Sequence, residues 1–218
     1  MGPKRPYADR AEAGAVLAST LTGLEGMRCV VAALPRGGVP VALPIARELD
    51  APLTLSFARK LTLDRVPELA VGAVDEDGHV LMDASTVSEL GATLDELVEA
   101  RTRATREIAR QQQMFPVPPL ERFFPDASVV LVDDGPATGL TLRLAIAHAR
   151  RHGALDVIVA VPCSSVLAAS RLGREADRFI CPWVDPDFLA VGKHYDDFHQ
   201  MSDAEVLEQL ARLQKTPG

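Results

Sequence analysis

The residues best suited to chemistry lie in one short segment, 129–141, which reads VVLVDDGPATGLT. Two carboxylates, Asp133 and Asp134, follow an apolar run and precede a glycine-rich turn that ends in hydroxyl residues. Carboxylates suit the vicinal hydroxyls of a sugar or the water shell of a divalent cation. Free backbone N–H groups and threonine hydroxyls suit a phosphate monoester. The segment therefore predicts a site for a phosphorylated sugar.

The elements around this segment would place the two functions side by side. Val129 to Val132 is apolar without alternation, which is typical of a strand buried on both faces of a parallel sheet. The apolar pattern after Thr141 predicts a helix to His152, with Gly153 as its stop. No Lys precedes the hydroxyl residue as in a Walker loop.

A second anion-binding loop is expected after an earlier apolar strand, Cys29 to Leu34. Gly37 and Gly38 would expose backbone N–H groups at the start of the next helix, and Arg36 can donate two hydrogen bonds to phosphate oxygens. An Arg-Gly-Gly turn alone is weak evidence, since it is more often only a turn. Like the acidic segment, however, this turn lies at the C-terminal end of an expected strand, and this position favours an anion-binding function.

These two segments resemble known motifs. Segment 129–141 resembles the phosphoribosyl-pyrophosphate (PRPP) motif of type I phosphoribosyltransferases, and 34–53 resembles the pyrophosphate loop and following helix of the same family, in particular of a subgroup of uncharacterised predicted members. The resemblance covers nearly the whole chain. It implies that Asp133 and Asp134 contact the ribose and that Arg36, Gly37 and Gly38 hold pyrophosphate. It assigns the 5′-phosphate to the loop made of Gly135, Pro136, Ala137, Thr138, Gly139, Leu140 and Thr141.

The resemblance implies a fold and a reaction. The fold is α/β, a mainly parallel twisted sheet flanked by helices, with a small inserted or hood subdomain. The reaction transfers a 5-phosphoribosyl group from PRPP to a nitrogen acceptor, expected to be a nucleobase, and releases pyrophosphate. Mg²⁺ would accompany PRPP, held through water by Asp133 and Asp134, and the catalytic set would be these acids with Arg36. The alternative is a PRPP-binding regulator of the same fold without catalysis.

Two cations extend the pyrophosphate site in this interpretation. Arg59 and Lys60 follow an expected strand, Leu53 to Ala58, and match an Arg-Lys-Leu pattern of the subgroup. A solvated strand end is the usual alternative for such a pair. The polar stretch Thr62 to Val66 is expected to be a mobile loop that closes over the reacting centre.

The chain is expected to be a single domain, 1–218, with two additions. Residues 69–113 would form an inserted subdomain, a hairpin with its turn at 75–78 followed by a long helix that starts at a Thr93 and Glu96 capping box. Residues 179–218 would form a C-terminal hood segment and helix.

The acceptor pocket is the least defined part of the prediction. Cys163 and Ser164 follow another buried strand, and Trp183 and Phe188 could stack on a planar base, although helix capping and core packing are the commoner roles of such residues. Hypoxanthine-guanine transferases carry an Asp where this chain has Ala137, so the general base would be another carboxylate. The candidates by loop position are Glu68, Asp185 and Asp187.

Composition excludes several classes. A net charge of −7 argues against a nucleic-acid partner, and no apolar run approaches the roughly 20 residues of a membrane helix. Three cysteines without C-x-x-C spacing are expected to be reduced, and residues 1–10 lack the apolar core of a signal peptide, which favours a cytoplasmic chain. The expected partners include a second copy of the chain in a homodimer.

His148 and His152 have a spacing that can bind metal. The Glu that zinc proteases place between such histidines is missing, and cationic groups near a helix C-terminus have a simpler role with the helix dipole. We therefore expect no metal site at this pair.

Overall fold

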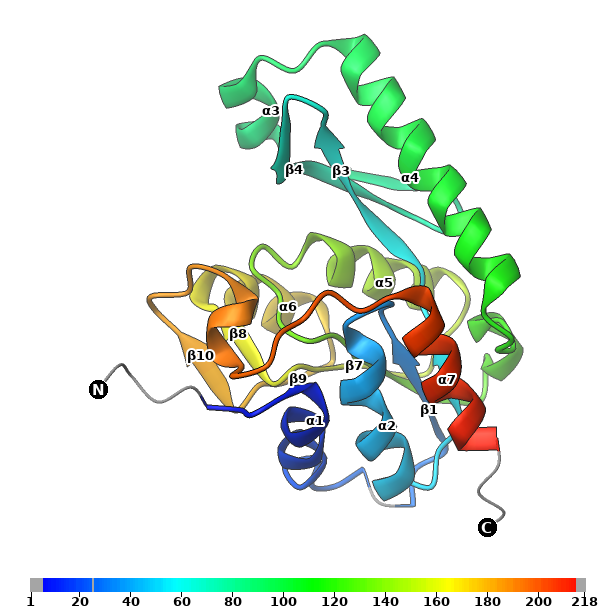
Figure 1. Cartoon of the computed structure of the whole chain (residues 1–218). Coiled ribbons are helices and arrows are strands. Elements are labelled where there is room, and N and C mark those ends of the chain that lie inside the picture. Colours follow the sequence, from blue (N-terminus) through cyan, green and yellow to red (C-terminus); the bar gives the residue numbers. More distant parts are fainter. Residues whose placement is uncertain (1–5, 25, 215–218) are drawn as a thin grey trace.

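The computed structural model describes residues 6–24 and 26–214 (Figure 1). At its centre lies a five-stranded sheet in the order β2-β1-β6-β7-β9, and every neighbouring pair is parallel. The strands are β1 (Cys29–Ala33), β2 (Leu53–Leu55), β6 (Ser128–Val132), β7 (Val157–Ala160) and β9 (Arg178–Ile180). The predicted α/β fold with a mainly parallel sheet is confirmed.

Successive residues of a strand point to opposite faces of the sheet, so apolar strands need cover on both faces. Helices provide this cover. Val31 and Val130 pack with α1, α2 and α7 on one face, whereas Val30 and Val129 pack with α5 and α6 on the other. The helices of these two layers are α1 (Arg10–Ala18), α2 (Gly38–Glu48), α5 (Leu140–Arg151), α6 (Val166–Glu175) and α7 (Asp203–Gln214). The central strands β1, β6 and β7 are thus buried on both faces, as their apolar sequences predict.

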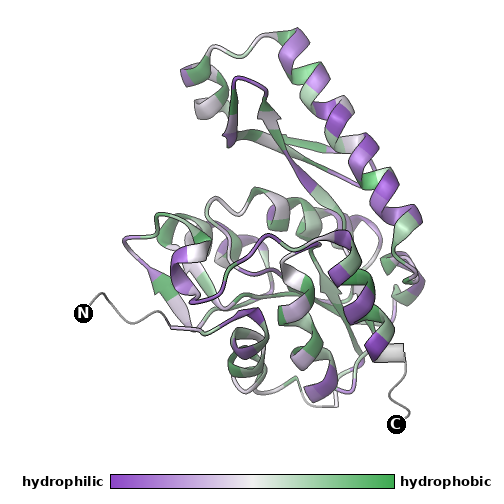
Figure 2. Ribbon diagram, viewed as in Figure 1, coloured by the Kyte–Doolittle hydropathy of each residue, from purple (hydrophilic) through white to green (hydrophobic). Residues whose placement is uncertain are grey.

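A second layer of structure, residues 58–114, extends from the core and is called the flap below (Figure 1). It contains the antiparallel strands β3 (Ala58–Leu63), β4 (Val66–Asp75) and β5 (Val80–Met82), followed by α3 (Ala84–Leu90) and α4 (Leu94–Met114). α4 starts at the capping box predicted for Thr93 and Glu96. Its buried apolar residues, Ala100, Ala104 and Ile108, recur every four positions, and much of the helix is otherwise hydrophilic (Figure 2), although Leu94 and Val98 are exposed.

The flap begins earlier than the expected boundary at Leu69. β2 ends at Leu55, and Ala58 starts a strand that pairs with β4 instead of extending the parallel sheet. Buried Leu61 and Leu63 alternate with the half-buried Thr62 between them, a pattern suited to a strand with one wet face. The expectation that Arg59 and Lys60 follow a parallel strand was therefore wrong, since both lie within β3.

The stretch Thr62 to Val66 is also more regular than expected. Leu63 pairs with Val66, so only Asp64 and Arg65 connect β3 to β4. Arg65 donates hydrogen bonds to Glu96 and to the Leu90 carbonyl, which ties this hairpin to the start of α4. The stretch is a hairpin tip rather than an irregular loop.

The C-terminal part combines a core strand with additional elements. Residues 178–180 form β9 of the core sheet, so the separate segment begins after Ile180, slightly later than expected. Beyond β9, β10 (Trp183–Asp185) pairs with β8 (Cys163–Ser165), and a short 3₁₀ turn follows at η2 (Val191–His194); another, η1 (Leu120–Phe123), lies between α4 and β6. Tyr7 and Tyr195 form a parallel bridge, which joins the segment before α1 to the segment after η2.

Within the described ranges, no helix is both long enough and apolar enough to cross a membrane.

Candidate functional site

The two predicted anion loops lie next to each other because β1 and β6 are neighbours in register, with Ala33 opposite Val132. Their contact is close. A Cβ atom on Gly37 would lie 2.1 Å from Asp134 Oδ2, and one on Gly38 would lie 2.5 Å from the Val132 carbonyl oxygen. Only residues without a side chain fit at these positions. The two loops therefore interlock at the C-terminal edge of the sheet, as the sequence predicts.

Asp134 is held by one residue of α1 and one residue after η2. Arg10 Nε donates a hydrogen bond of 2.8 Å to Asp134 Oδ2, and the Tyr195 hydroxyl donates one of 2.5 Å to the Asp134 carbonyl oxygen. The Arg10 guanidinium lies 3.8 Å from the centre of the Phe198 ring and also donates to the His199 carbonyl. Sequence reasoning missed Arg10 because no local pattern connects it to the acidic pair.

Asp133 has a different environment from Asp134. Burial, together with the charge of Asp134, raises the pKa of Asp133 to about 7, although the Asp134 N–H donates to its Oδ1 over 2.9 Å and Lys60 and Arg10 act in the opposite direction. One of the two acids is thus poised to change charge near neutral pH. Oxygen ligands of this kind fit a hydrated Mg²⁺ ion, which would favour the charged form.

The loop after the acidic pair has the geometry of an anion cradle. Gly139, with φ +76°, is the N-cap of α5, and the first N–H groups of a helix have no partner within the helix. Ser165 holds the back of the loop, since its N–H donates to the Pro136 carbonyl over 3.2 Å and its hydroxyl to the Ala137 carbonyl over 2.6 Å. The amides at the start of α5 are therefore available for a phosphate.

The side chains of the loop contribute unequally. Thr138 and Thr141 are half-buried, whereas Leu140 is buried in the core, so Leu140 can offer only its backbone. Gly135 is fixed by packing, because a Cβ atom there would lie 2.7 Å from Cys163 Sγ.

A cavity of about 410 Å³ adjoins both loops. Its lining consists of Arg10, Arg36, Gly37, Arg59, Asp134, Phe198, Gln200 and Met201. Three guanidinium groups thus meet beside one acid of the pair. The structure brings Arg36, Gly37 and Arg59 together as predicted, although Arg59 comes from the flap rather than from the end of a core strand. Lys60 is exposed and does not line this cavity.

In the structure, Arg36 and Arg59 of this cavity form ion pairs with carboxylates. Arg36 lies 3.8 Å from Asp203 of α7, and Arg59 lies 3.8 Å from Glu107 of α4. Arg110 joins these carboxylates, with 2.6 Å contacts to each. Burial lowers the pKa of Arg59, while the charge of Glu107 opposes this effect. Arg36 and Arg59 can exchange their long, 3.8 Å ion pairs for contacts to phosphate oxygens.

The predicted acceptor residues divide into two groups. Cys163 and Ser164 are fully buried; Cys163 Sγ donates to the Asp134 carbonyl over 3.6 Å, and the Ser164 hydroxyl donates to the Ser165 carbonyl. They support the PRPP-like loop from behind and present no surface to an acceptor. Trp183 is 47% exposed on β10, and Phe188 stacks on His194 with ring centres 4.8 Å apart. Of the four predicted acceptor residues, Trp183 and Phe188 are the two with exposed surface.

The candidates for a general base also differ. Asp185 Oδ2 lies 2.9 Å from Nε2 of buried His194, and its Oδ1 accepts the N–H of Asp187. Glu68 and Asp187 are exposed. Asp185 alone of the three has a titratable partner among the described residues, a pairing that the sequence did not predict.

Comparison with known proteins relates this chain to a family. Residues 10–184 match the model of the phosphoribosyl transferase domain. Two proteins of Mycobacterium tuberculosis, named "Putative phosphoribosyl transferase MT0597" and "Putative phosphoribosyl transferase Rv0571c", are each 38% identical to the chain over 96% of its length. The chain spans 47% of each of these relatives.

A solved structure agrees with this match. The crystal structure of TT1426 from Thermus thermophilus is 34% identical in sequence, with a TM-score of 0.72, and the alignment covers 94% of this chain and 98% of that one. The interlocked acidic and glycine-rich loops lie within the matched residues. The chain therefore belongs to the type I phosphoribosyltransferase family.

Proposed function

We propose that this protein transfers the 5-phosphoribosyl group of PRPP to a nitrogen acceptor, a nucleobase in our proposal, and releases pyrophosphate. The observation that carries the proposal is the contact between Gly37 and Asp134. It places the arginine-lined cavity directly beside the carboxylates. PRPP requires a pyrophosphate site next to a ribose site, because its pyrophosphate and its ribose hydroxyls lie on adjacent carbons.

Each part of the site then has a role. Arg36, Arg59 and the amides at Gly37 and Gly38 hold the pyrophosphate, the cradle at residues 135–141 holds the 5′-phosphate, and Asp133 and Asp134 orient the ribose. The bond between C1 and the pyrophosphate oxygen breaks as the nitrogen of the acceptor approaches, so C1 becomes oxocarbenium-like. Mg²⁺ bound with PRPP would neutralise the charge of the leaving pyrophosphate.

A second function is favoured by one observation. The loop expected to touch the acceptor, Cys163 and Ser164, is buried, so the described residues supply few polar groups to a base. A PRPP-binding regulator would need the arginine cavity and the acidic pair but no acceptor pocket. A homodimer stays a prediction under either function.

Binding and turnover distinguish these functions. Asp133→Asn and Asp134→Asn should each weaken PRPP binding in the presence of Mg²⁺ by roughly ten- to hundredfold, the equivalent of about 1.5 to 3 kcal/mol for a charged hydrogen bond. The control is Asp126→Asn, an exposed carboxylate before β6. Calorimetry measures the affinities, and pyrophosphate release is screened with a panel of nucleobases.

The outcomes are distinct. Unchanged PRPP affinity in both variants, with the fold intact, would contradict the site assignment. PRPP binding by the wild-type protein without pyrophosphate release on any base would favour the regulator.

A further inference from the structure

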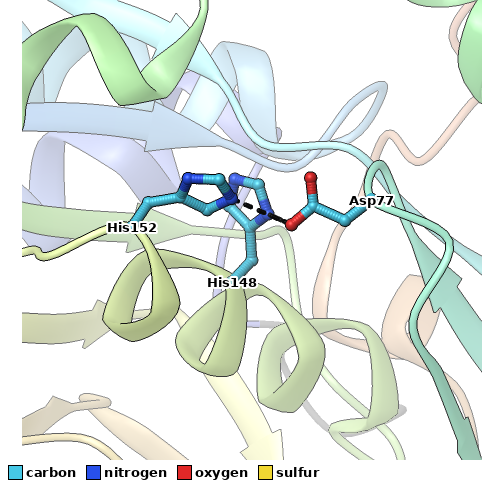
Figure 3. Close-up of side chains that lie close together, drawn as sticks. All are labelled: Asp77, His148 and His152. Carbon is cyan, nitrogen blue, oxygen red and sulfur yellow. Dashed lines mark hydrogen bonds and ion pairs between the residues drawn. The ribbon is translucent and has the colours of Figure 1, made fainter.

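A separate cluster of titratable side chains lies where the flap meets the core (Figure 3). Asp77 comes from the turn between β4 and β5, and His148 and His152 come from successive turns at the C-terminal end of α5. Asp77 Oδ2 lies 3.1 Å from His148 Nδ1 and 2.9 Å from His152 Nε2. One nitrogen of each ring thus points at the same carboxylate oxygen.

Two imidazole nitrogens and one carboxylate oxygen form a donor set that Zn²⁺ and similar first-row cations prefer. In a tetrahedral site with bonds of about 2.0 to 2.1 Å, two donors lie roughly 3.3 Å apart. The observed separations of 2.9 and 3.1 Å are close to this value. Small side-chain movements would therefore open the cluster to an ion, with a fourth position left for water.

The second ring nitrogen of His148 gives independent support. The His148 side chain is 1% exposed, and its Nε2 lies 2.9 Å from Glu121 Oε1 and 3.7 Å from Glu76 Oε1. This buried nitrogen nevertheless has no hydrogen bond of acceptable geometry. Metal-binding histidines usually donate their other N–H to a carboxylate, which fixes the ring. A small rotation of His148 toward a metal would let Nε2 complete such a bond with Glu121.

The charge around the pair also favours a cation. Asp75, Asp77 and Glu121 face the cluster, as does Glu76, and Arg151 contacts Asp77 at 3.2 Å. Arg151 also contacts Asp75 at 2.5 Å, so it can remain there when a metal takes Asp77.

We propose that Asp77, His148 and His152 bind a divalent transition-metal ion, with Zn²⁺ as the best fit, and that this ion fastens the flap to the core. The site is distinct from the PRPP site, because α5 has 12 residues and its opposite ends lie about 18 Å apart. The sequence argued against metal at the histidine pair because the Glu of a zinc protease is missing and the helix dipole offers a simpler role. The third ligand proposed here lies 71 residues before His148.

The test uses the full-length protein freed of metal by a chelator and measured without PRPP or Mg²⁺. Calorimetry with Zn²⁺ should show one ion per chain, and Co²⁺ should give the visible absorption of a tetrahedral complex. Asp77→Asn and His152→Asn should each weaken Zn²⁺ binding by at least about 100-fold, at or above the effect of losing an outer-shell partner. Zn²⁺ should raise the melting temperature of the wild-type protein but not of these variants.

Two control variants locate the site. His199→Asn removes an exposed histidine that pairs with Glu205 elsewhere, and should leave Zn²⁺ binding unchanged. His79→Asn tests the neighbouring set of Asp75, Asp77 and His79, which also brings its ligand atoms together, and should likewise have little effect. In the wild-type protein, Zn²⁺ should shift the NMR signals of the His148 and His152 rings, a readout that needs no variant to fold.

Three results would overturn the proposal. The first is the absence of Zn²⁺ binding and of histidine shifts in the wild-type protein. The second is equal affinity in Asp77→Asn and His152→Asn, which would place the ion elsewhere. The third is loss of binding in His79→Asn but not in His152→Asn, which would assign the ion to the neighbouring set.

Discussion

Arg10 and Asp134 form an almost buried ion pair, with side chains 9% and 14% exposed, although 124 residues separate them in the sequence. The pair fixes one oxygen of the acid that we assign to the ribose. α1 therefore contributes to the geometry of the site through Arg10, which also lines the cavity beside the two loops.

Arg10→Met should destabilise the protein by about 3 to 5 kcal/mol, because removing one member of a buried pair leaves the other charge without compensation. Urea unfolding measures the change. The control is Arg28→Met, whose partner Asp126 is 3.5 Å away and where both side chains are largely exposed, and it should cost no more than about 1 kcal/mol. Similar losses in the two variants would show that Asp134 does not depend on Arg10.

Gly37→Ala should weaken PRPP binding, because a Cβ atom would displace the Asp134 carboxylate. The loss should be at least about tenfold, which corresponds to one hydrogen bond to a charged group. The matched control is Gly173→Ala in α6, where a Cβ atom meets nothing within 4 Å. That change should raise stability by up to about 1 kcal/mol, the helix preference of Ala over Gly. Calorimetric titration with PRPP and thermal unfolding check both; normal affinity in Gly37→Ala would contradict the interlock.

Arg36→Ala should weaken the binding of pyrophosphate and PRPP but spare ribose 5-phosphate, because the 5′-phosphate is assigned to the loop at residues 135–141. Asp203→Asn should have the opposite effect on pyrophosphate, since it removes a carboxylate 3.8 Å from Arg36. Calorimetry with the three ligands measures this division. Equal weakening of all three by Arg36→Ala would be inconsistent with it.

The raised pKa of Asp133 predicts a pH dependence of stability. An unfolded Asp releases its proton near pH ~4, whereas folded Asp133 keeps it until about pH 7. Between these values the folded state binds more protons, so the contribution of Asp133 to the free energy of unfolding falls as pH rises. Urea unfolding without ligand at pH 5 and pH 8 should show a larger fall for the wild type than for Asp133→Asn. Parallel curves would indicate an unperturbed Asp133.

Hypoxanthine and guanine should be poor acceptors. Ala137 stands where transferases for these bases carry an Asp, and a general base typically contributes about 10²- to 10⁴-fold in rate. Steady-state assays of pyrophosphate release with each base provide the measurement. If either base were the best substrate, with kcat/KM near ~10⁵ M⁻¹s⁻¹, the prediction would fail.

Local sequence signals account for the parts of the structure that were predicted. The apolar run Val129 to Val132 identifies a buried parallel strand, and Thr93 with Glu96 marks the start of α4. The loop at Gly37 and Gly38 was recognisable because it directly follows the apolar strand Cys29 to Leu34. In each case, the cause of the structure lies within a few residues of the sequence that shows it.

The remaining features depend on contacts between distant segments. Arg59 was expected at the end of a parallel strand because the apolar residues before it do not show where the sheet changes, and the break after Leu55 depends on pairing with β4. The partners Arg10 with Asp134 and Asp77 with His148 are joined only by the folded chain. The burial of Cys163 was predicted, but its packing against Gly135, which keeps it from an acceptor, depends on a contact between two loops that periodicity cannot reveal.

The two arginines assigned to pyrophosphate lie in different parts of the molecule, the core and the flap. Arg36 follows a strand of the core sheet, while Arg59 lies in the first strand of the flap. Any rotation of the flap about its junction with the core changes the spacing between these guanidinium groups. If Arg36 and Arg59 hold pyrophosphate as we propose, a rotation that moves them apart would weaken the binding of the released pyrophosphate.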